Sequence, residues 1–474
     1  MRNLLAVWAG KATLGLSRRL GHGGSSLPGM VALRIQPALL LELARGLRRG
    51  TIIITGTNGK TTTARFLSTI LEDAGLRLVH NRSGANLVAG LTSSFLEASR
   101  GGVVDADIAL MEVDEATVPE AVRELRPLGL VVTNFFRDQL DRFGELDTTV
   151  SFIGRGLDAM QGHGFVALNA DDPLVAYLGR GRGGHVVYYG VEDPASGSKV
   201  MTQTREQCQC LVCGRPLTYE VFYYGHLGRY GCPTGDFRRP APGFRAGAVA
   251  LGGSGGTAFT LSSPDRPDTQ VRLPVPGLYN VYNGLAALTA ALELGIPVER
   301  AAASLRRATA SFGRMERIAM EGRSVLLALV KNPTGYNQVL RTILESGLPA
   351  GSPGRRLLMA LNDKYADGTD VSWIWDVDFE VLAEPGAQVA GVVASGERAH
   401  DLAVRLKYAG VRRDQIQCVP DLGEALDLAL GSTPAGETLF ITPTYTAMLE
   451  LRGIISRRGF APQFWETGGE AAQP

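Results

Sequence analysis

The stretch Thr55–Thr63 reads TGTNGKTTT and decides the class of fold. It follows an apolar run at Thr51–Ile54 that is typical of a buried strand, and it leads into a helical pattern from Thr61 to Ala74. A glycine-rich turn between a strand and a helix brings backbone N–H groups and a helix N-terminus to one point, where they can hold a phosphate. The stretch therefore predicts an α/β domain that binds a nucleotide.

Each position of this loop has an expected role. Gly56 and Gly59 let the backbone curl and approach a phosphate closely. Lys60 can reach the β- and γ-phosphates of ATP, and the Thr61 hydroxyl can bind Mg²⁺. The first glycine of the general Walker pattern falls on Ile54, so that pattern is incomplete, and a tight turn with an incidental lysine is the alternative. The expected ATP-binding residues of the loop are Gly56, Thr57, Asn58, Gly59, Lys60, Thr61 and Thr62.

Strand-like and helix-like segments alternate along most of the chain. Apolar runs recur at Ile108–Val113, Leu130–Thr133 and Phe165–Leu168 with helix-like segments between them, which predicts a parallel sheet. The alternation stops near residue 200 and resumes beyond about residue 315, and the 474 residues correspond to about three domains. The expected units are an N-terminal helical segment at 1–45, a central ATP-binding domain at 46–310 with an insertion at 200–245, and a C-terminal α/β domain at 311–474.

Composition excludes several classes of protein. The net charge is +1, so no global field attracts the chain to nucleic acid or to an anionic membrane. No apolar stretch approaches the roughly 20 residues of a membrane-spanning helix. The first twenty residues lack the apolar core and cleavage site of a signal peptide. We therefore expect a cytoplasmic protein that does not bind nucleic acid, and peripheral contact of an amphipathic N-terminal helix with the inner face of the membrane stays open.

Six segments of the chain resemble the Mur ligase and folylpolyglutamate synthase superfamily. The loop is the first, and the others follow in the order of that superfamily: EVDE at 112–115, TN at 133–134 with DQLD at 138–141, LNADDP at 168–173, GLYNVYNGLAA at 277–287 and GRME at 313–316. The resemblance covers most of the chain. It implies a central P-loop ATPase domain with a parallel sheet and a Rossmann-like C-terminal α/β domain.

The same resemblance implies roles for three residues outside the loop. Glu112 stands where these ligases place a Mg²⁺-binding Glu, and Asn280 and Arg314 stand where they contact the nucleotide. Each has a simpler alternative, because Glu112 can end a strand, Asn280 can satisfy a helix start, and Arg314 can be a surface residue of a linker.

Departures from the superfamily pattern concern the amino-acid half of the reaction. Ordinary members add an amino acid to a carboxylate through an acyl phosphate, and many bridge a second Mg²⁺ with a carbamylated Lys. By spacing from Asp138 that Lys would fall near Ile153, and no lysine lies between Lys60 and Lys199. The DYAHNP segment of the third domain reads ALVKNP at 328–333. These changes count against an amino-acid acceptor site.

One branch of the superfamily matches these departures. Leu361–Asp363 and ADGTDVSWIWD at 366–376 closely resemble the MurT family, the synthetase subunits of lipid II isoglutaminyl synthase. The resemblance implies that ATP phosphorylates the α-carboxylate of D-glutamate in the lipid II stem peptide, with Lys60 and Glu112 in the catalytic site. Ammonia from a GatD-like glutamine amidotransferase subunit, bound as a heterodimer, then gives D-isoglutamine for peptidoglycan synthesis.

The resemblance also assigns a residue to the partner's chemistry. In this family a third-domain Asp orients the catalytic His of the glutaminase subunit, and by position that Asp is Asp370. Asp367 and Asp376 are alternates, and a helix cap is the simpler interpretation of Asp370. A glutaminase of its own would need an activated Cys beside a His. Cys418 is the one cysteine outside the cluster below, and no His occurs in the last 74 residues, so we expect a structural Cys.

Four of the five cysteines lie within residues 208–232. This grouping indicates a metal site in a reducing compartment better than a set of disulfides. The cluster resembles the zinc ribbon inserted in MurT proteins, although Thr234 stands where the last Cys is expected. The expected zinc ligands are Cys208, Cys210, Cys213 and Cys232. His226 as the fourth ligand, and a ribbon that folds without metal, are the alternatives.

Two other functions are less consistent with the sequence. A ligase of the Mur or folylpolyglutamate type that adds an amino acid is disfavoured by the missing bridging Lys. A non-catalytic ATP-binding module with a nucleic-acid-binding ribbon is disfavoured by the neutral charge and by the presence of both Thr61 and Glu112.

Overall fold

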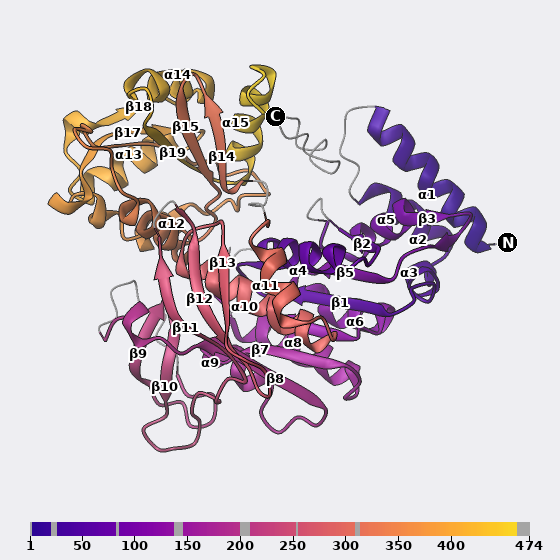
Figure 1. Ribbon diagram of the computed structural model, residues 1–474. Coiled ribbons are helices and arrows are strands. Elements are labelled where there is room, and N and C mark those ends of the chain that lie inside the picture. Colours follow the sequence, from indigo (N-terminus) through magenta and orange to yellow (C-terminus); the bar gives the residue numbers. More distant parts are fainter. Residues whose placement is uncertain are drawn as a thin grey trace.

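Two α/β units make up the molecule, as the computed structural model in Figure 1 shows. The structure describes residues 2–19, 26–81, 85–136, 146–199, 209–252, 255–308 and 313–461. One unit is built on a nine-stranded sheet and the other on a six-stranded sheet. No helix within these ranges is both long enough and apolar enough to cross a membrane.

The central sheet has the strand order β13-β12-β11-β8-β7-β6-β1-β5-β2. Every neighbouring pair from β2 to β11 is parallel, whereas β12 and β13 run antiparallel at one edge. The predicted parallel sheet is therefore confirmed. The strands are β1 (Gly50–Thr55), β2 (Leu78–His80), β5 (Ile108–Glu112), β6 (Gly129–Val132), β7 (Phe165–Asn169), β8 (His185–Val191), β11 (Phe244–Leu251), β12 (Thr257–Ser262) and β13 (Thr269–Leu273).

Helices cover both faces of this sheet, which explains the continuous apolar run of β1. Ile52 and Ile54 pack under α4 (Lys60–Asp73), α10 (Leu278–Glu293) and α11 (Val298–Leu305). Ile53 points to the opposite face. That face is covered by α5 (Val88–Ala98), α6 (Val118–Leu125), α8 (Leu146–Met160) and α9 (Pro173–Leu178). A strand buried on both faces has no polar side to show, as is usual in parallel sheets.

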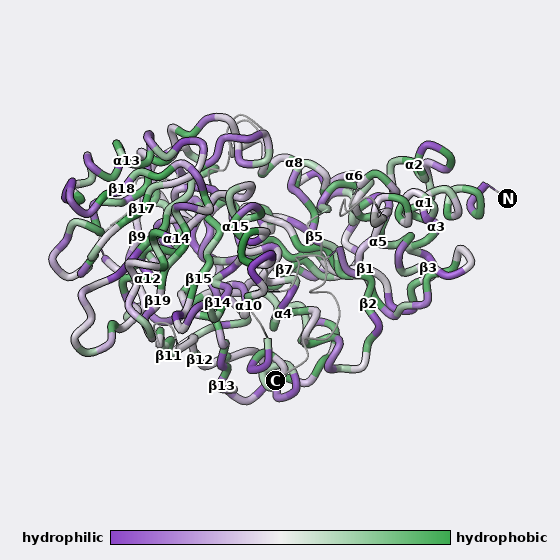
Figure 2. The backbone as a smooth tube through the Cα atoms, turned by 90° about the horizontal axis from the view of Figure 1, so that it is seen from above, coloured by the Kyte–Doolittle hydropathy of each residue, from purple (hydrophilic) through white to green (hydrophobic). Residues whose placement is uncertain are grey.

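Three N-terminal helices pack on α5, at the end of the molecule that carries the N-terminus (Figure 2). They are α1 (Arg2–Arg19), α2 (Leu27–Ile35) and α3 (Leu39–Ala44). Ala6 and Val7 of α1 and Ala32 of α2 join the hydrophobic core on the α5 side of the sheet. These helices therefore extend the central unit and do not form a core of their own.

The C-terminal unit has the strand order β14-β15-β19-β16-β17-β18. β14 and β15 form an antiparallel pair, and the remaining neighbours are parallel. α12 (Pro333–Glu345) and α13 (Ala399–Tyr408) cover one face, and α14 (Leu422–Ser432) and α15 (Tyr445–Arg457) the other. The strands are β14 (Arg314–Met320), β15 (Arg323–Ala328), β16 (Arg355–Ala360), β17 (Val389–Ser395), β18 (Ile416–Cys418) and β19 (Thr438–Pro443).

The insertion after β8 is a small antiparallel hairpin with its own core. β9 (Thr218–Tyr224) pairs with β10 (Leu227–Gly231). The hairpin turns at Gly225, which has a φ of +54°, and a Cβ there would lie 2.7 Å from the Phe136 ring and 3.3 Å from the Thr334 methyl group. The tip of the insertion therefore packs between the central unit and α12 of the C-terminal unit.

Candidate active site

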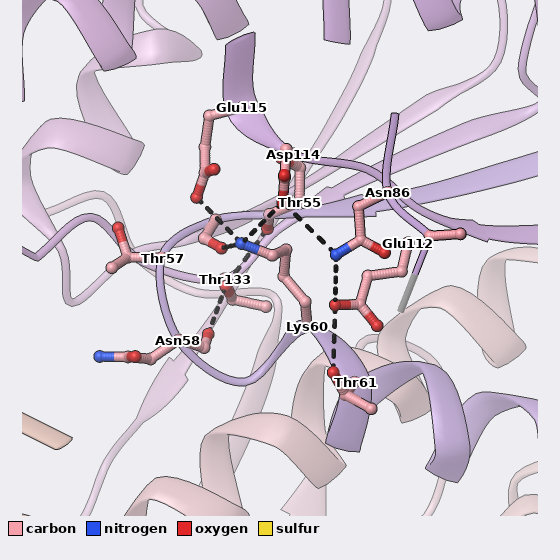
Figure 3. Close-up of polar contacts among 12 residues, drawn as sticks. Thr55, Thr57, Asn58, Lys60, Thr61, Asn86, Glu112, Asp114, Glu115 and Thr133 are labelled. Atoms are coloured by element: carbon pink, nitrogen blue, oxygen red, sulfur yellow. Dashed lines mark hydrogen bonds and ion pairs between the residues drawn. The ribbon is translucent and has the colours of Figure 1, made fainter. Parts of the chain in front are cut away.

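The loop between β1 and α4 is held in its curve by the end of the neighbouring strand β6. Asn58 N–H donates to Asn134 Oδ1 at 2.9 Å, and the Thr133 hydroxyl donates to the Asn58 carbonyl at 2.8 Å (Figure 3). Gly56 and Gly59 have φ values of +122° and +88°. A Cβ on Gly59 would lie 2.1 Å from Asn283 Oδ1, so only glycine fits there. The loop is thus preformed.

Lys60 lies almost buried inside this loop, with only 10% of its side chain exposed. Its ammonium donates to the Gly56 carbonyl at 2.6 Å and lies 3.2 Å from Glu115 Oε1 and 3.8 Å from Asp114 Oδ1 (Figure 3). The cation is therefore balanced by two carboxylates at the loop. An arriving phosphate would offer the same cation another anion, at the place where P-loop lysines hold phosphates.

Thr61 and Glu112 meet beside the lysine. The Thr61 hydroxyl donates to Glu112 Oε1 at 3.0 Å, and Asn86 Nδ2 donates to the same oxygen at 3.0 Å. The Glu112 backbone is clamped by Asn81, whose Oδ1 accepts from Glu112 N–H at 2.9 Å and whose Nδ2 donates to the Glu112 carbonyl at 2.7 Å. A hydroxyl and a carboxylate are hard oxygen donors of the kind Mg²⁺ prefers, so the two residues fit a magnesium ion.

Sequence reasoning missed Asn81. It placed Asn86 in the segment 82–86, which resembles the MurT family and was expected to hold the lipid II peptide, and gave it no contact with Glu112. Asn81 directly follows β2, which neighbours β5, the strand that ends in Glu112. The carboxyl ends of adjacent parallel strands meet at one edge, where ligands bind in such sheets. That rule could have pointed to Asn81, but applying it requires the strand order of the sheet, which the sequence does not give. Residues 82–84 lie outside the described ranges.

A cleft of about 720 Å³ opens between the loop, α10 and the C-terminal unit. Asn332 Nδ2 donates to Asn58 Oδ1 across it at 3.0 Å, while Asn332 Oδ1 caps α12 by accepting from Gly335 N–H at 2.8 Å. Among the residues that line the cleft are the predicted Asn58, Gly59, Thr62, Asn280 and Arg314.

The two predicted nucleotide contacts outside the loop differ in how they are held. Asn280 donates to the Pro276 carbonyl at 2.7 Å and accepts from Asn283 at 3.1 Å, so it also serves the start of α10. Arg314 begins β14 at the wall of the cleft.

Thr57, another predicted residue of the loop, hydrogen-bonds through its hydroxyl to the Phe136 carbonyl at 3.2 Å, which gives its side chain a structural contact. Asp138–Asp141 lies outside the described residues.

Three cysteines of the insertion come together as a candidate metal centre. The sulfur atoms of Cys210, Cys213 and Cys232 all lie within 4.8 Å of one another. Thr234 Oγ1 lies 2.8 Å from Cys232 Sγ and 3.5 Å from Cys213 Sγ, so the Thr at the expected cysteine position stands beside the thiols. Its hydrogen bond lowers the pKa of Cys232 to about 6, which favours the thiolate that binds a metal.

Two residues were candidates for the fourth ligand of this centre, Cys208 and His226. Cys208 lies outside the described residues. His226 as a ligand is wrong, because its ring is fully buried at the hairpin tip, with Nε2 at 3.3 Å from Asp172 Oδ2 and the ring 4.8 Å from that of Phe136. His226 packs the insertion against the central unit instead.

Comparison with known proteins places this architecture in a family. The family model of the Mur ligase middle domain matches residues 54–227, and that of the MurT ligase C-terminal domain matches residues 329–448. The lipid II isoglutaminyl synthase (glutamine-hydrolyzing) subunit MurT of Staphylococcus aureus strain COL is 34% identical over 418 residues, or 87% of this chain and 89% of that protein. The chain belongs to the MurT family. The Streptococcus pneumoniae subunit MurT is 32% identical over 97% of this chain and 98% of its own length.

Solved structures agree with the fold of this MurT-family chain. A pseudomurein peptide ligase type C from Methanothermus fervidus superimposes with a TM-score of 0.64 at 25% identity, covering 87% of this chain and 79% of that one. MurF from Acinetobacter baumannii gives a TM-score of 0.62 at 18% identity, covering 89% and 80%. The second likeness concerns the fold alone.

The MurT-type segment of the C-terminal unit presents two carboxylates to solvent and buries a third. Asp370 is exposed. Hydrogen bonds from the Ser372 side chain and from the Ser372 N–H, the latter to Oδ1 at 2.8 Å, hold the pKa of Asp370 below its usual value. Asp367 is buried and accepts from both the N–H and the hydroxyl of Thr446. Asp376 is exposed. Asp367 is therefore hydrogen-bonded within the fold, whereas the Asp370 carboxylate is exposed to solvent.

Cys418 lies beside a histidine that its position in the chain did not reveal. Its Sγ lies 3.3 Å from His400 Nδ1, so a histidine does stand beside it, although none follows it in the chain. β18 and the start of α13 bring the two side chains together. Desolvation raises the pKa of the Cys418 thiol, which is the opposite of what an activated nucleophile needs. The pair therefore gives no sign of an activated glutaminase nucleophile.

Proposed function

We propose that the chain is the synthetase subunit of a lipid II isoglutaminyl synthase, acting in peptidoglycan synthesis. In this proposal a carboxylate oxygen of the D-glutamate residue in the stem peptide attacks the γ-phosphorus of ATP, and ADP leaves. Ammonia then attacks the carbonyl carbon, phosphate leaves, and a proton is lost as the amide forms. The observation that carries the proposal is the meeting of Lys60, Thr61 and Glu112 at the end of β1 in a chain of the MurT family.

The chemistry explains why ATP is needed. A carboxylate is a poor electrophile, and ammonia needs a leaving group to displace. Lys60 would neutralise charge on the phosphoryl group as it moves, and Thr61 and Glu112 would hold Mg²⁺, which would polarise the phosphate oxygens. Asn81 and Asn86 would keep the Glu112 carboxylate aimed at Thr61. The remaining loop residues, with Asn280 and Arg314, would bind the nucleotide.

Two departures from the superfamily pattern count against an amino-acid site and fit a small nucleophile. The position where many superfamily members carry a bridging Lys is near Ile153, which belongs to α8 and is fully buried in the hydrophobic core. The segment that resembles DYAHNP carries Asn332, and that side chain is used to join α12 to the loop. We infer that the acceptor is ammonia and not an amino acid.

We further propose that a GatD-like glutaminase subunit supplies this ammonia in a heterodimer. Asp370 would orient the partner's catalytic His, because its carboxylate is exposed on the C-terminal unit. The pair of Cys418 and His400 would stay a structural contact. We place the complex in the cytoplasm, peripheral to the inner face of the membrane where a lipid-linked substrate lies.

Zinc is proposed for the cysteine cluster of the insertion. Cys210, Cys213 and Cys232 would supply three thiolates and Cys208 the fourth, which gives the tetrahedral all-sulfur set of a structural site. The bound ion would stabilise the insertion, whose hairpin packs with its tip between the two α/β units. Its part would be structural, since a closed four-ligand set leaves no position for a substrate.

Co-expression with a glutaminase subunit tests the function. The complex should convert lipid II, ATP and glutamine to amidated lipid II, detected by mass spectrometry, and the chain by itself should do so with ammonium but not with glutamine. Glutamine-dependent amidation by the isolated chain, or a product that carries an added amino acid, would contradict the proposal.

A further inference from the structure

The first helix, α1, is apolar on two opposite faces. Its inward face uses Ala6, Val7 and Gly10, and a Cβ on Gly10 would already lie 2.6 Å from the Leu96 side chain of α5. The outward face carries Leu4, Leu5, Trp8 and Leu16, whose side chains are 50%, 62%, 75% and 60% exposed.

Helical geometry places these four outward residues together. At about 100° per residue, positions 4, 5, 8 and 16 fall on one side of the helix, opposite positions 6 and 10. Ala12 and Gly15 lie between them and are also exposed. The outward stripe from Leu4 to Leu16 therefore contains no charged side chain. A surface helix of a globular protein normally shows a polar face to water, so this stripe indicates a surface that something covers.

Neighbouring elements also carry exposed apolar residues. On α2, Leu27 and Met30 are exposed at helical spacing. In the hairpin of β3 (Ser99–Arg100) and β4 (Val103–Val104), Val103 is exposed, and a Cβ on Gly102 would lie 3.2 Å from the Leu4 side chain. Figures 1 and 2 both place α1 on the outer edge of the molecule, away from the C-terminal unit. We call this set of seven residues the α1 surface: Leu4, Leu5, Trp8, Leu16, Leu27, Met30 and Val103.

The first 41 residues of the chain carry formal charges of a single sign. In a chain whose net charge is +1, no Asp or Glu occurs before Glu42. Arg2 and Arg34 are exposed, as is Arg100 of the hairpin. The basic residues of the first 41 positions are Arg2, Lys11, Arg18, Arg19 and Arg34.

We propose that the α1 surface docks on the surface of an anionic lipid bilayer. Leucine and tryptophan side chains flanked by arginines are the pattern of helices that lie in the interface plane, where the apolar face enters the acyl boundary and the cations meet lipid phosphates. The proposal rests on the proposed function, because a lipid-linked substrate is confined to that surface. A second copy of the chain fits less well, since a two-fold contact would bring two acid-free basic stretches together.

Vesicle sedimentation of the full-length chain tests the proposal. The chain should sediment with vesicles of phosphatidylglycerol and phosphatidylcholine, far less with phosphatidylcholine alone, and less as salt is raised. The variant Leu5→Glu with Trp8→Glu should lose at least about tenfold in partitioning. Val404→Glu is the matched control, because Val404 is an exposed apolar residue of α13 far along the chain, and it should sediment like the wild type. Thermal unfolding should show that both variants stay folded.

Three results would overturn the proposal. They are equal sedimentation of the double variant and the wild type, no sedimentation with anionic vesicles, and a dimer or a complex with a glutaminase subunit that the double variant abolishes without lipid. Amidation of lipid II in detergent micelles separates this proposal from the proposed function. The double variant should keep that activity, whereas a chain that binds vesicles but never amidates lipid II would leave the α1 surface intact and refute the function.

Discussion

Replacing Lys60 by Met should lower both stability and activity. Stability falls because the ammonium loses its contacts with Gly56 and Glu115, and activity falls because it no longer neutralises the phosphoryl group. In the folded chain the Lys60 ammonium is bonded to the Gly56 carbonyl at 2.6 Å and paired with Glu115 at 3.2 Å, and both side chains are nearly buried. The charge-assisted bond is worth about 2 kcal/mol, and leaving the Glu115 carboxylate without its cation adds about 2 kcal/mol. We therefore expect Lys60→Met to lower the local unfolding free energy by about 4 kcal/mol.

A second substitution separates the two contributions. Adding Glu115→Gln removes the stranded charge, so the double variant should regain about 2 kcal/mol relative to Lys60→Met. Catalysis should not return, because neither side chain can then neutralise the phosphoryl group, and ADP release should stay at least about 100-fold below the wild type in both variants.

Hydrogen exchange of the α4 amides, read by mass spectrometry, measures the local free energy at the loop. Lys407→Met serves as the control, because Lys407 is exposed on α13 and its loss should change stability by less than about 0.5 kcal/mol. The reasoning is refuted if Lys60→Met exchanges like the wild type, if the double variant is no more protected than the single one, or if either variant retains wild-type ADP release.

Three further predictions concern the other parts of the site. Glu112→Gln keeps the shape that accepts from Thr61 but removes a charge, so magnesium-dependent ADP release should fall about 100- to 1,000-fold with little loss of stability; an unchanged rate would exclude Glu112 as a magnesium ligand. Asp370→Asn should lower glutamine-dependent amidation by roughly 1,000-fold or more and leave ammonium-dependent amidation intact, and an equal loss with both nitrogen sources would reject its role in the partner's triad. Metal analysis should find one zinc per chain, and both Cys213→Ser and Cys208→Ser should lose it; zinc retained in Cys208→Ser would point to Thr234 as the remaining contact, and a folded wild type without zinc would end the proposal.

Sequence alone predicted the features that are encoded locally. The strand, loop and helix around Gly56–Lys60 follow from residue order, because each turn of backbone is set by neighbours a few positions away. The parallel sheet was predictable for the same reason, since each apolar run is followed by a helical pattern that must cross over. The cysteine spacing likewise indicated a cluster, and three of its thiols do meet.

Tertiary structure decided the contacts between residues far apart in the chain. Asn81 and Asn86 reach Glu112 because β2 lies beside β5, Asn332 reaches Asn58 because the C-terminal unit closes over the loop, and His400 reaches Cys418 although it precedes it by eighteen residues. Strand order and the packing of one unit on another follow from the burial of the whole apolar surface, which no local pattern encodes. Residue order could therefore supply the chemistry of each group, and only the assembled fold could supply its partner.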